Sequence, residues 1–308
     1  MNRDQLLRAI LVCYGLALLV GLFSILHPKD WRLKRVPKKQ PGSLAIIHIY
    51  GPIRTDLSAS AWASPDADDV AKRLHRLSEN EEVKAILLRI NSPGGTVGAV
   101  QEIHTEILRC KAKGKKVVAS LGDVAASGGY YLASSADRIV TDPGTITGSI
   151  GVVMQFGNLQ GLFQKVGVQW EVIKSGPFKD IGSPSRPLTP EERRLLQASI
   201  DDAYDQFVVA VSTGRKMPVE KLRSLADGRI YTGRQALAAG LVDELGNQED
   251  AVQVAIRLAG LPAQPTILSD TKRSLSDLIK HLSSSVGRTN LETLVEGWSG
   301  PSLEYRWR

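Results

Sequence analysis

Short apolar runs alternate with helical segments in the first half of the chain, and this order constrains the possible folds most. Three runs have the length and composition of buried strands: Leu44–Tyr50, Val83–Ile90 and Val117–Leu121. A helix is predicted after each run, with starts near Ser64-Pro65-Asp66, Val97 and Ser127. Strands that alternate with helices predict an α/β fold, in which repeated βαβ units build a parallel sheet with right-handed crossovers.

The second half of the predicted domain contains further elements of both kinds. Ile150–Phe156 and Trp170–Ile173 are predicted as strands on either side of a helix at Leu159–Val166. Thr189 and Glu192 have the spacing of a capping box, which predicts the start of a helix that runs to about Thr213. Three shorter elements follow: a strand at Arg229–Tyr231, a helix from Thr232 to Gly240, and a helix at Ala251–Leu258. Residues 43–261 are therefore predicted to form one domain.

The N-terminal segment predicts a membrane anchor. Ala9–Leu26 is an uncharged, mostly apolar run of 18 residues, which is close to the lower limit for a membrane-spanning helix. A cleavable signal peptide is the alternative, but the exit Phe23–Pro28 offers no good small-residue cleavage site. We therefore expect residues 1–28 to be a single-pass anchor in the cell (inner) membrane, with the lipid bilayer as a partner. Residues 29–42 then form a basic linker, whose charges place the domain in the cytoplasm by the positive-inside rule.

The charge distribution argues against nucleic-acid binding by the domain, and the cysteine content argues against a disulfide. The formal net charge is +7, and residues 1–39 hold eight basic and two acidic side chains, so the remainder is almost neutral. Nucleic-acid binding by the domain is therefore not expected. The two cysteines, Cys13 and Cys110, are not expected to form a disulfide, and Cys110 is predicted to be a core residue.

Residues 262–308 are predicted to be a C-terminal helical tail with an apolar stripe: Leu275, Leu278, Ile279 and Leu282.

The segment Gly122–Val140 contains the first candidate for catalysis. Its sequence, GDVAASGGYYLASSADRIV, places Ser127 between a strand, which Gly122-Asp123 would end, and a helix that begins with Gly128. Unpaired N–H groups and the positive end of the helix dipole favour an oxyanion beside a nucleophile. The alternative is that Ser127 is only a helix cap and that the glycines only permit close packing.

A base for a serine nucleophile is harder to find. None of the five histidines is predicted in a loop beside Ser127, so a Ser-His-Asp arrangement lacks an obvious base, and lysine is the known alternative. Asp123 could suggest a third member of a triad but is more typical of a turn. The sequence contains neither HExxH nor CxxC, and no metal or other cofactor is predicted.

Five segments together carry a family resemblance. They are NSPGG at Asn91–Gly95, the segment around Ser127, TGSIGVV at Thr147–Val153, SGPFKDIGSP around Lys179, and DGRIYTGRQALAAGLVDELG at Asp227–Gly246. In this order they resemble the bacterial signal peptide peptidase A family in its short, single-domain form. The resemblance covers roughly residues 44–260 and implies the Clp protease/crotonase fold.

The resemblance also implies roles for particular residues. Ser127 matches the nucleophile, Lys179 the general base, and Ser149 the serine that hydrogen-bonds the lysine. The N–H groups of Gly128 and of a glycine in the NSPGG turn, taken as Gly95, match the oxyanion hole. A solvated loop lysine and a turn hydroxyl remain the alternatives for Lys179 and Ser149. Spacing alone does not choose between Lys179 and its neighbours Lys165 and Lys174.

These observations predict a membrane-anchored serine endopeptidase with a Ser-Lys dyad, which degrades cleaved signal peptides and other short hydrophobic peptides. The resemblance further implies a homo-oligomeric ring and a domain on the outer face of the membrane, in conflict with the basic linker. In the long form of the family, the two halves of one chain supply the serine and the lysine separately. Because this chain has one copy of each motif, the resemblance implies that Ser127 and Lys179 pair between protomers, and we expect them to lie beyond hydrogen-bond distance within one chain. The alternatives are a crotonase-type acyl-CoA enzyme, whose acidic residues and CoA phosphate site are not evident, and a non-catalytic membrane scaffold.

Overall fold

Eight strands form one sheet, in which six follow the order β7-β6-β4-β2-β1-β9. The computed structural model describes residues 42–55, 66–269 and 304–306, which all belong to the unit Pro41–Arg308. The strands are β1 (Ser43–Tyr50), β2 (Val83–Ser92), β4 (Lys116–Ala126), β5 (Arg138–Thr141), β6 (Ile146–Gly148), β7 (Ile230–Thr232), β8 (Glu244–Leu245) and β9 (Thr266–Ser269). Strand β5 pairs with β4 and β8. All pairs are parallel except β6 with β7, so the predicted α/β class is confirmed.

Helices cover both faces of this sheet. Alternate residues of β1 separate the two faces: Ile47 and Ile49 join the larger core with α2, α3, α4 and α6, whereas Leu44 and Ile46 join a smaller core with α9. Cys110 is buried in the larger core, where burial raises the pKa of its thiol to about 11, so its prediction as a core residue is confirmed. The helices are α2 (Ala67–Glu79), α3 (Val97–Ala112), α4 (Gly128–Ser134), α5 (Gln160–Lys165), α6 (Pro190–Arg215), α7 (Val219–Arg223), α8 (Gly233–Ala239) and α9 (Gln248–Ala259).

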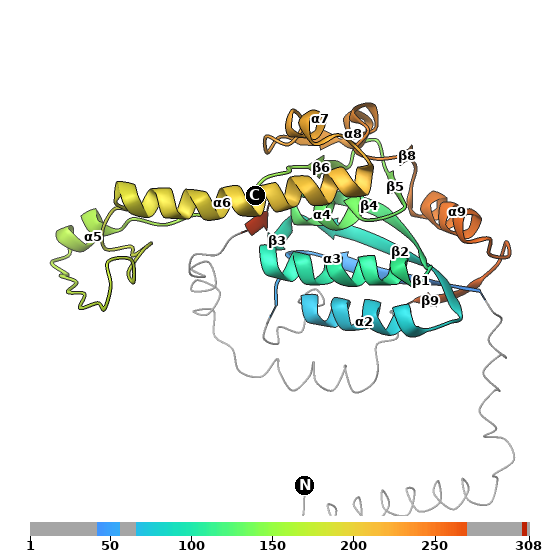
Figure 1. Ribbon diagram of the computed structural model, residues 1–308, viewed down its shortest axis with the longest axis horizontal. Helices are drawn as coiled ribbons and strands as arrows, with labels where there is room; N and C mark the ends of the chain where they lie inside the picture. Colours follow the sequence, from blue (N-terminus) through green and yellow to red (C-terminus); the bar gives the residue numbers. More distant parts are fainter. Residues whose placement is uncertain (1–41, 56–65, 270–303, 307–308) are drawn as a thin grey trace, which may run out of the picture. The chain divides into compact units, whose positions relative to one another are not determined.

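Helix α6 packs on the body through its second half only. The predicted capping box is confirmed, because Thr189 Oγ1 accepts a hydrogen bond from Glu192 N and Glu192 Oε2 accepts one from Thr189 N. Apart from Glu192, the buried residues of α6 begin at Ala203. Gly214 lies so close to α4 that an added Cβ would be 2.0 Å from the carbonyl oxygen of Ser134. The first half of α6 extends away from the sheet, and α5 lies near its start (Figure 1).

The predicted strands at Ile150–Phe156 and Trp170–Ile173 are wrong. Apart from an isolated bridge residue at Val153, both stretches are irregular and belong to none of the strands of the sheet, although the helix between them is present as α5. The side chains of Trp170 and Ile173 are 64% and 95% exposed. Their apolar pattern is therefore typical of a surface rather than of a buried strand.

Strand β4 is also longer than predicted. Gly122-Asp123 does not end it, because a register shift between Ile90 and Ser92 on β2 lets the pairing continue. Its last residues, Val124 to Ala126, then pair with β6. The extension carries the chain directly to Ser127.

The C-terminal tail differs from the prediction where it is described. Within the predicted helical tail, 262–308, Thr266–Ser269 is strand β9 on β1, and Glu304–Arg306 is strand β10, which pairs antiparallel with β3 (Gly94–Thr96). The apolar stripe of this tail and the predicted anchor at residues 1–28 lie outside the described residues. In the part of the chain that is described, no helix combines the length and apolarity needed to cross a bilayer.

Candidate active site

The carboxyl ends of β2, β4 and β6 bring three of the sequence motifs together. The register places Ser92 beside Ala125 and Ala126 beside Gly148. Ser127 follows Ala126, Ser149 follows Gly148, and the rest of the NSPGG turn follows Ser92. Because strands with parallel neighbours end at the same edge, residues far apart in sequence meet here.

Two residues at this edge have unusual backbone conformations. Ser127 has φ 53° and ψ −117°, and Ser149 has φ 50°. Lys216 is the third non-glycine residue with positive φ in the described ranges, and it is explained as the left-handed cap of α6. The two serines are linked, since Ser127 N donates to Gly148 O at 2.8 Å. Strained residues that cluster in this way are typical of functional sites.

Ser127 occupies the position before α4 without acting as a helix cap. Its side chain makes no capping hydrogen bond, and the residue is 1% exposed. The interpretation of Ser127 as only a cap is therefore wrong. Gly128 is the first residue of α4, so its N–H has no acceptor within the helix and is available to an oxyanion.

The NSPGG turn packs directly against this position. An added Cβ at Gly129 would lie 2.8 Å from Ser92 O, so the start of α4 contacts the turn. Gly94 N donates to Ser92 Oγ at 3.1 Å, and Gly94 has φ 100°. Gly95 forms a bridge with Ile53 and also lies opposite Tyr305 in the pairing of β3 with β10. The candidate oxyanion residues Gly95 and Gly128 thus belong to two segments that touch.

Replacement of Gly95 by Ala is expected to destabilise the protein by about 1–3 kcal/mol, because the new Cβ would lie 1.8 Å from the backbone oxygen of Ile53. Denaturant unfolding would measure the change. Gly98→Ala is the matched control, since nothing lies within 4 Å of its Cβ position and the residue is within α3. Alanine there is expected to stabilise by up to about 1 kcal/mol. Equal stability of the Gly95→Ala and wild-type proteins would show that the turn relaxes freely.

Lys179 lies in a different part of the molecule. Its side chain is exposed and has no hydrogen bond or ion pair with any other described residue, Ser127 and Ser149 included. Its loop is bonded to Glu192 through Arg186, whereas α6 reaches α4 at Phe207, whose ring lies 4.8 Å from that of Tyr131. Along α6, Phe207 lies fifteen positions after Glu192, which is about 22 Å of helix. As expected for a single chain, no hydrogen bond joins Ser127 and Lys179 among the described residues.

The other candidate bases are also away from Ser127 or already bonded. Lys174 Nζ donates to Asp180 Oδ1 at 2.6 Å and to Pro177 O at 3.0 Å. His75 contacts Glu106 and Arg109, and His104 contacts the ring of Tyr131, where burial and then Lys111 lower the pKa of His104. Among the described residues, no histidine or lysine donates to or accepts from Ser127. The described ranges also contain no cluster of three His, Cys, Asp or Glu residues suited to a metal ion.

Asp123 has a local role at the end of the sheet. Its carboxylate accepts from Asn91 Nδ2 at 3.4 Å, and Asn91 Oδ1 accepts from Val124 N at 3.0 Å. This contact connects β2 to β4 across the register shift. Asp123 therefore stabilises the pairing of β2 with β4, and it contacts none of the described histidines.

Comparison with known proteins agrees with this fold. The family model for Clp protease matches residues 52–142, and the model for peptidase family S49 matches residues 109–262. A Synechocystis sp. protein that carries a protease name is 46% identical over 266 residues, which cover 86% of this chain and 90% of that protein. The fold and these matches define a serine peptidase with a Clp protease-like α/β domain.

Two further relatives specify the family. The chloroplastic serine protease SPPA of Arabidopsis thaliana is 37% identical over 247 residues, and an Enterococcus faecium protein named for signal peptide peptidase SppA is 41% identical over 180 residues. These matches cover 79% and 58% of this chain, but 36% and 52% of the two relatives. The chain belongs to peptidase family S49, the signal peptide peptidase family.

Proposed function

We propose that the protein is an endopeptidase that hydrolyses cleaved signal peptides and other short hydrophobic peptides with a Ser-Lys dyad. Ser127 is the nucleophile, Lys179 the general base, and Ser149 the residue that orients the lysine amine. The N–H groups of Gly128 and Gly95 stabilise the oxyanion. The substrate class is suggested by the names of relatives such as signal peptide peptidase SppA.

One observation supports this proposal most: the strained Ser127 lies beside Gly128, the NSPGG turn and the strained Ser149. Attack by the serine hydroxyl requires transfer of its proton to a base, and the negative charge on the carbonyl oxygen requires N–H donors. The edge of the sheet offers a buried serine with the helix-start N–H next to it. Among the described residues, no lysine or histidine is hydrogen-bonded to this serine, so the proposal requires a base from elsewhere.

We propose that a second copy of the chain supplies that base. The region around α5 and the following loop exposes a set of large apolar side chains: Leu162, Val166, Val168, Trp170, Val172, Ile173 and Phe178. Exposed apolar patches of this kind mark surfaces that are covered by a partner. A homo-oligomeric ring, in which this region of one protomer meets the Ser127 edge of the next, both covers these side chains and completes the dyad.

The proposed location is the cell membrane, with residues 1–28 as a single-pass anchor and the bilayer as a partner. The apolar run Ala9–Leu26 supports this part of the proposal. The resemblance favours the outer face for the domain. An anchor close to the domain would present membrane-derived hydrophobic peptides to the site at short range.

The role of Lys179 is tested by exchange for Arg and for Ala. Both variants are expected to lose hydrolysis of a short apolar peptide by at least about 100-fold, because arginine remains protonated and cannot accept the serine proton. Wild-type kcat/KM is expected to rise with pH, since only the neutral amine acts as a base. Full activity in Lys179→Arg, or a flat profile from about pH 5 to 10, would exclude a lysine base.

A further inference from the structure

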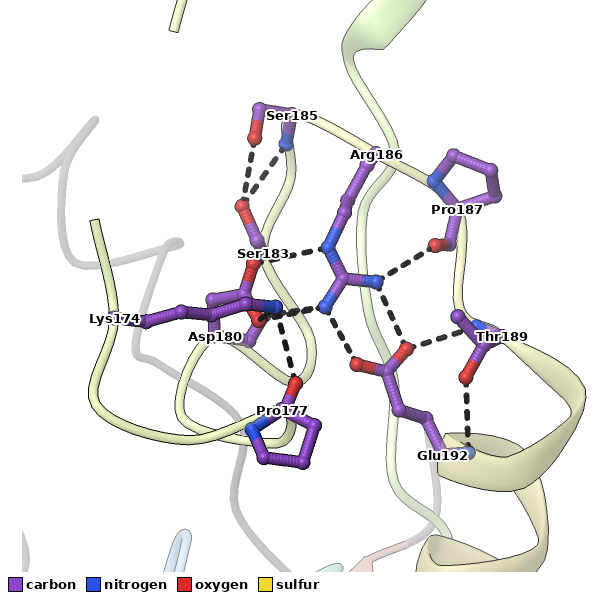
Figure 2. A network of polar contacts seen from close by, with 9 residues as sticks. All are labelled: Lys174, Pro177, Asp180, Ser183, Ser185, Arg186, Pro187, Thr189 and Glu192. Atoms are coloured by element: carbon purple, nitrogen blue, oxygen red, sulfur yellow. Dashed lines mark hydrogen bonds and ion pairs between the residues drawn. The ribbon is translucent and has the colours of Figure 1, made fainter. Parts of the chain in front are cut away.

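The loop that carries Lys179 is held by ion pairs among Lys174, Asp180, Arg186 and Glu192 (Figure 2). The side chain of Lys179 forms no ion pair with a described residue. Arg186 donates from Nε to Asp180 Oδ2 at 3.0 Å and from Nη2 to Asp180 Oδ1 at 2.8 Å. The same guanidinium donates from Nη1 to Glu192 Oε2 at 2.8 Å and from Nη2 to Glu192 Oε1. Both carboxylates are therefore held through two N–H groups, the strongest geometry available to an arginine.

This network connects the loop to the first turn of α6. Glu192 is 2% exposed and also accepts the Thr189 N–H of the capping box. At the other end, the backbone oxygen of Asp180 accepts from Ser183 N at 3.0 Å and from Arg186 Nη2 at 3.4 Å. The residue that follows Lys179 is thus held by both its side chain and its carbonyl group, so the network fixes where the Lys179 backbone lies.

The network also compensates the charge next to Lys179. Hydrogen bonds from Arg186 and then Lys174 hold the pKa of Asp180 well below its usual range, and Arg186 with the Thr189 N–H lowers the pKa of Glu192 to about 2. Two ionised carboxylates are balanced by two cations. The other charged side chains on the surrounding segments form no ion pair with described residues: Lys165, Glu171, Glu191, Arg193 and Arg194.

We infer that Arg186 is a positioning residue for Lys179, because it holds Asp180 against α6 and keeps this carboxylate from pairing with the neighbouring lysine amine. The inference rests on the proposed role of Lys179 as the base. A carboxylate released at position 180 would lie one residue from Lys179 and would favour the protonated amine. Fewer sites would then contain the neutral base at a given pH.

The test is the pH profile of kcat/KM for Arg186→Met, which removes the cation and keeps a long side chain. The midpoint of the profile is expected to move to higher pH by about 0.5–1 unit, so activity below the midpoint falls about three- to tenfold. Addition of Asp180→Asn to this variant is expected to move the midpoint back toward the wild-type value. If Arg186 served folding alone, Arg186→Met would lower activity at every pH without a change in the midpoint. Addition of Asp180→Asn would then not restore the activity.

Arg193→Met is the matched control, since it removes the same charge from an exposed arginine with no ion pair to a described residue. Its midpoint is expected to equal that of the wild type. An unchanged midpoint in Arg186→Met, or an equal change in Arg193→Met, would overturn the inference. If Arg186→Met does not fold, Lys174→Met removes the second cation on Asp180 and is expected to give a smaller change in the same direction.

A second readout separates this inference from the proposed function. Acetylation of Lys179 by acetic anhydride, followed by mass spectrometry over a pH series, reports the fraction of neutral amine even in an inactive protein. Arg186→Met is expected to displace this curve to higher pH, whether or not Lys179 is the base, and an undisplaced curve contradicts the inference. Retained hydrolysis in Lys179→Ala, by contrast, would remove the base assignment and leave the labelling result to decide the electrostatic part.

Discussion

Replacement of Ser127 by Gly is expected to abolish peptide hydrolysis and, at the same time, to stabilise the protein by about 1 kcal/mol or more. At φ 53° and ψ −117°, Ser127 has a backbone conformation that glycine adopts readily and that a residue with a Cβ adopts at a cost. The variant therefore removes the hydroxyl and the strain together. Hydrolysis of a short apolar peptide and unfolding in denaturant measure the two effects on one preparation.

Ser127→Ala is the matched control for this experiment. Alanine removes the hydroxyl but keeps the Cβ, so it is expected to be equally inactive with a stability close to that of the wild type. A fluorophosphonate probe should label only the wild-type protein of the three. Hydrolysis by purified Ser127→Ala would remove the assignment of the nucleophile, and equal stability of the Gly and Ala variants would mean that the backbone of Ser127 stores no strain.

Mixing inactive Ser127→Ala with inactive Lys179→Ala is expected to restore about a quarter of wild-type activity per chain after subunit exchange. On the proposed arrangement, each site takes its serine from one chain and its lysine from the next. With equal amounts and random mixing, half of the sites contain an intact serine, and half of those meet an intact lysine. Native mass spectrometry of the two chains, made distinguishable by isotope labelling, checks that exchange has occurred.

A second mixture, of wild-type chains with the double variant Ser127→Ala/Lys179→Ala, distinguishes the two possible geometries. Compared with the same total number of chains that are all wild type, sites shared between chains predict about a quarter of the activity, because half of the intact serines face a missing lysine. Sites formed within one chain predict one half, because every wild-type chain keeps its own pair. Verified exchange with no activity in the first mixture and one half in the second would place the dyad in a single chain.

The parallel sheet was predictable because its strands have a strong local signal. Leu44–Tyr50 and Val83–Ile90 are nearly continuous apolar runs, and helices with clear starts follow them. The short strands β5, β6 and β8 have two to four residues each and are formed by pairing with β4, β5 and β7 rather than by their own pattern. No local rule could identify them.

In the exposed segment after β6, by contrast, a strand was predicted that the structure does not contain. Trp170–Ile173 has the composition of a strand, but composition reports only that these side chains avoid water, not which surface covers them. For the candidate site, too, the sequence gives residue types and motifs but not the backbone conformation. The resemblance of the motifs proposed Ser127 and Ser149, which follow the ends of β4 and β6, but the positive φ angles of these two serines are properties of the folded backbone and cannot be read from the sequence.

The length of α6 has a consequence for when such an enzyme becomes active. Helix α6 is 26 residues long, and its first half extends away from the sheet together with α5 (Figure 1). On the proposed arrangement, a newly synthesised chain is inactive until it associates with a second chain. The specific activity therefore rises steeply with protein concentration before it levels off. Association between chains would then be the activating event, and dilution would reverse it.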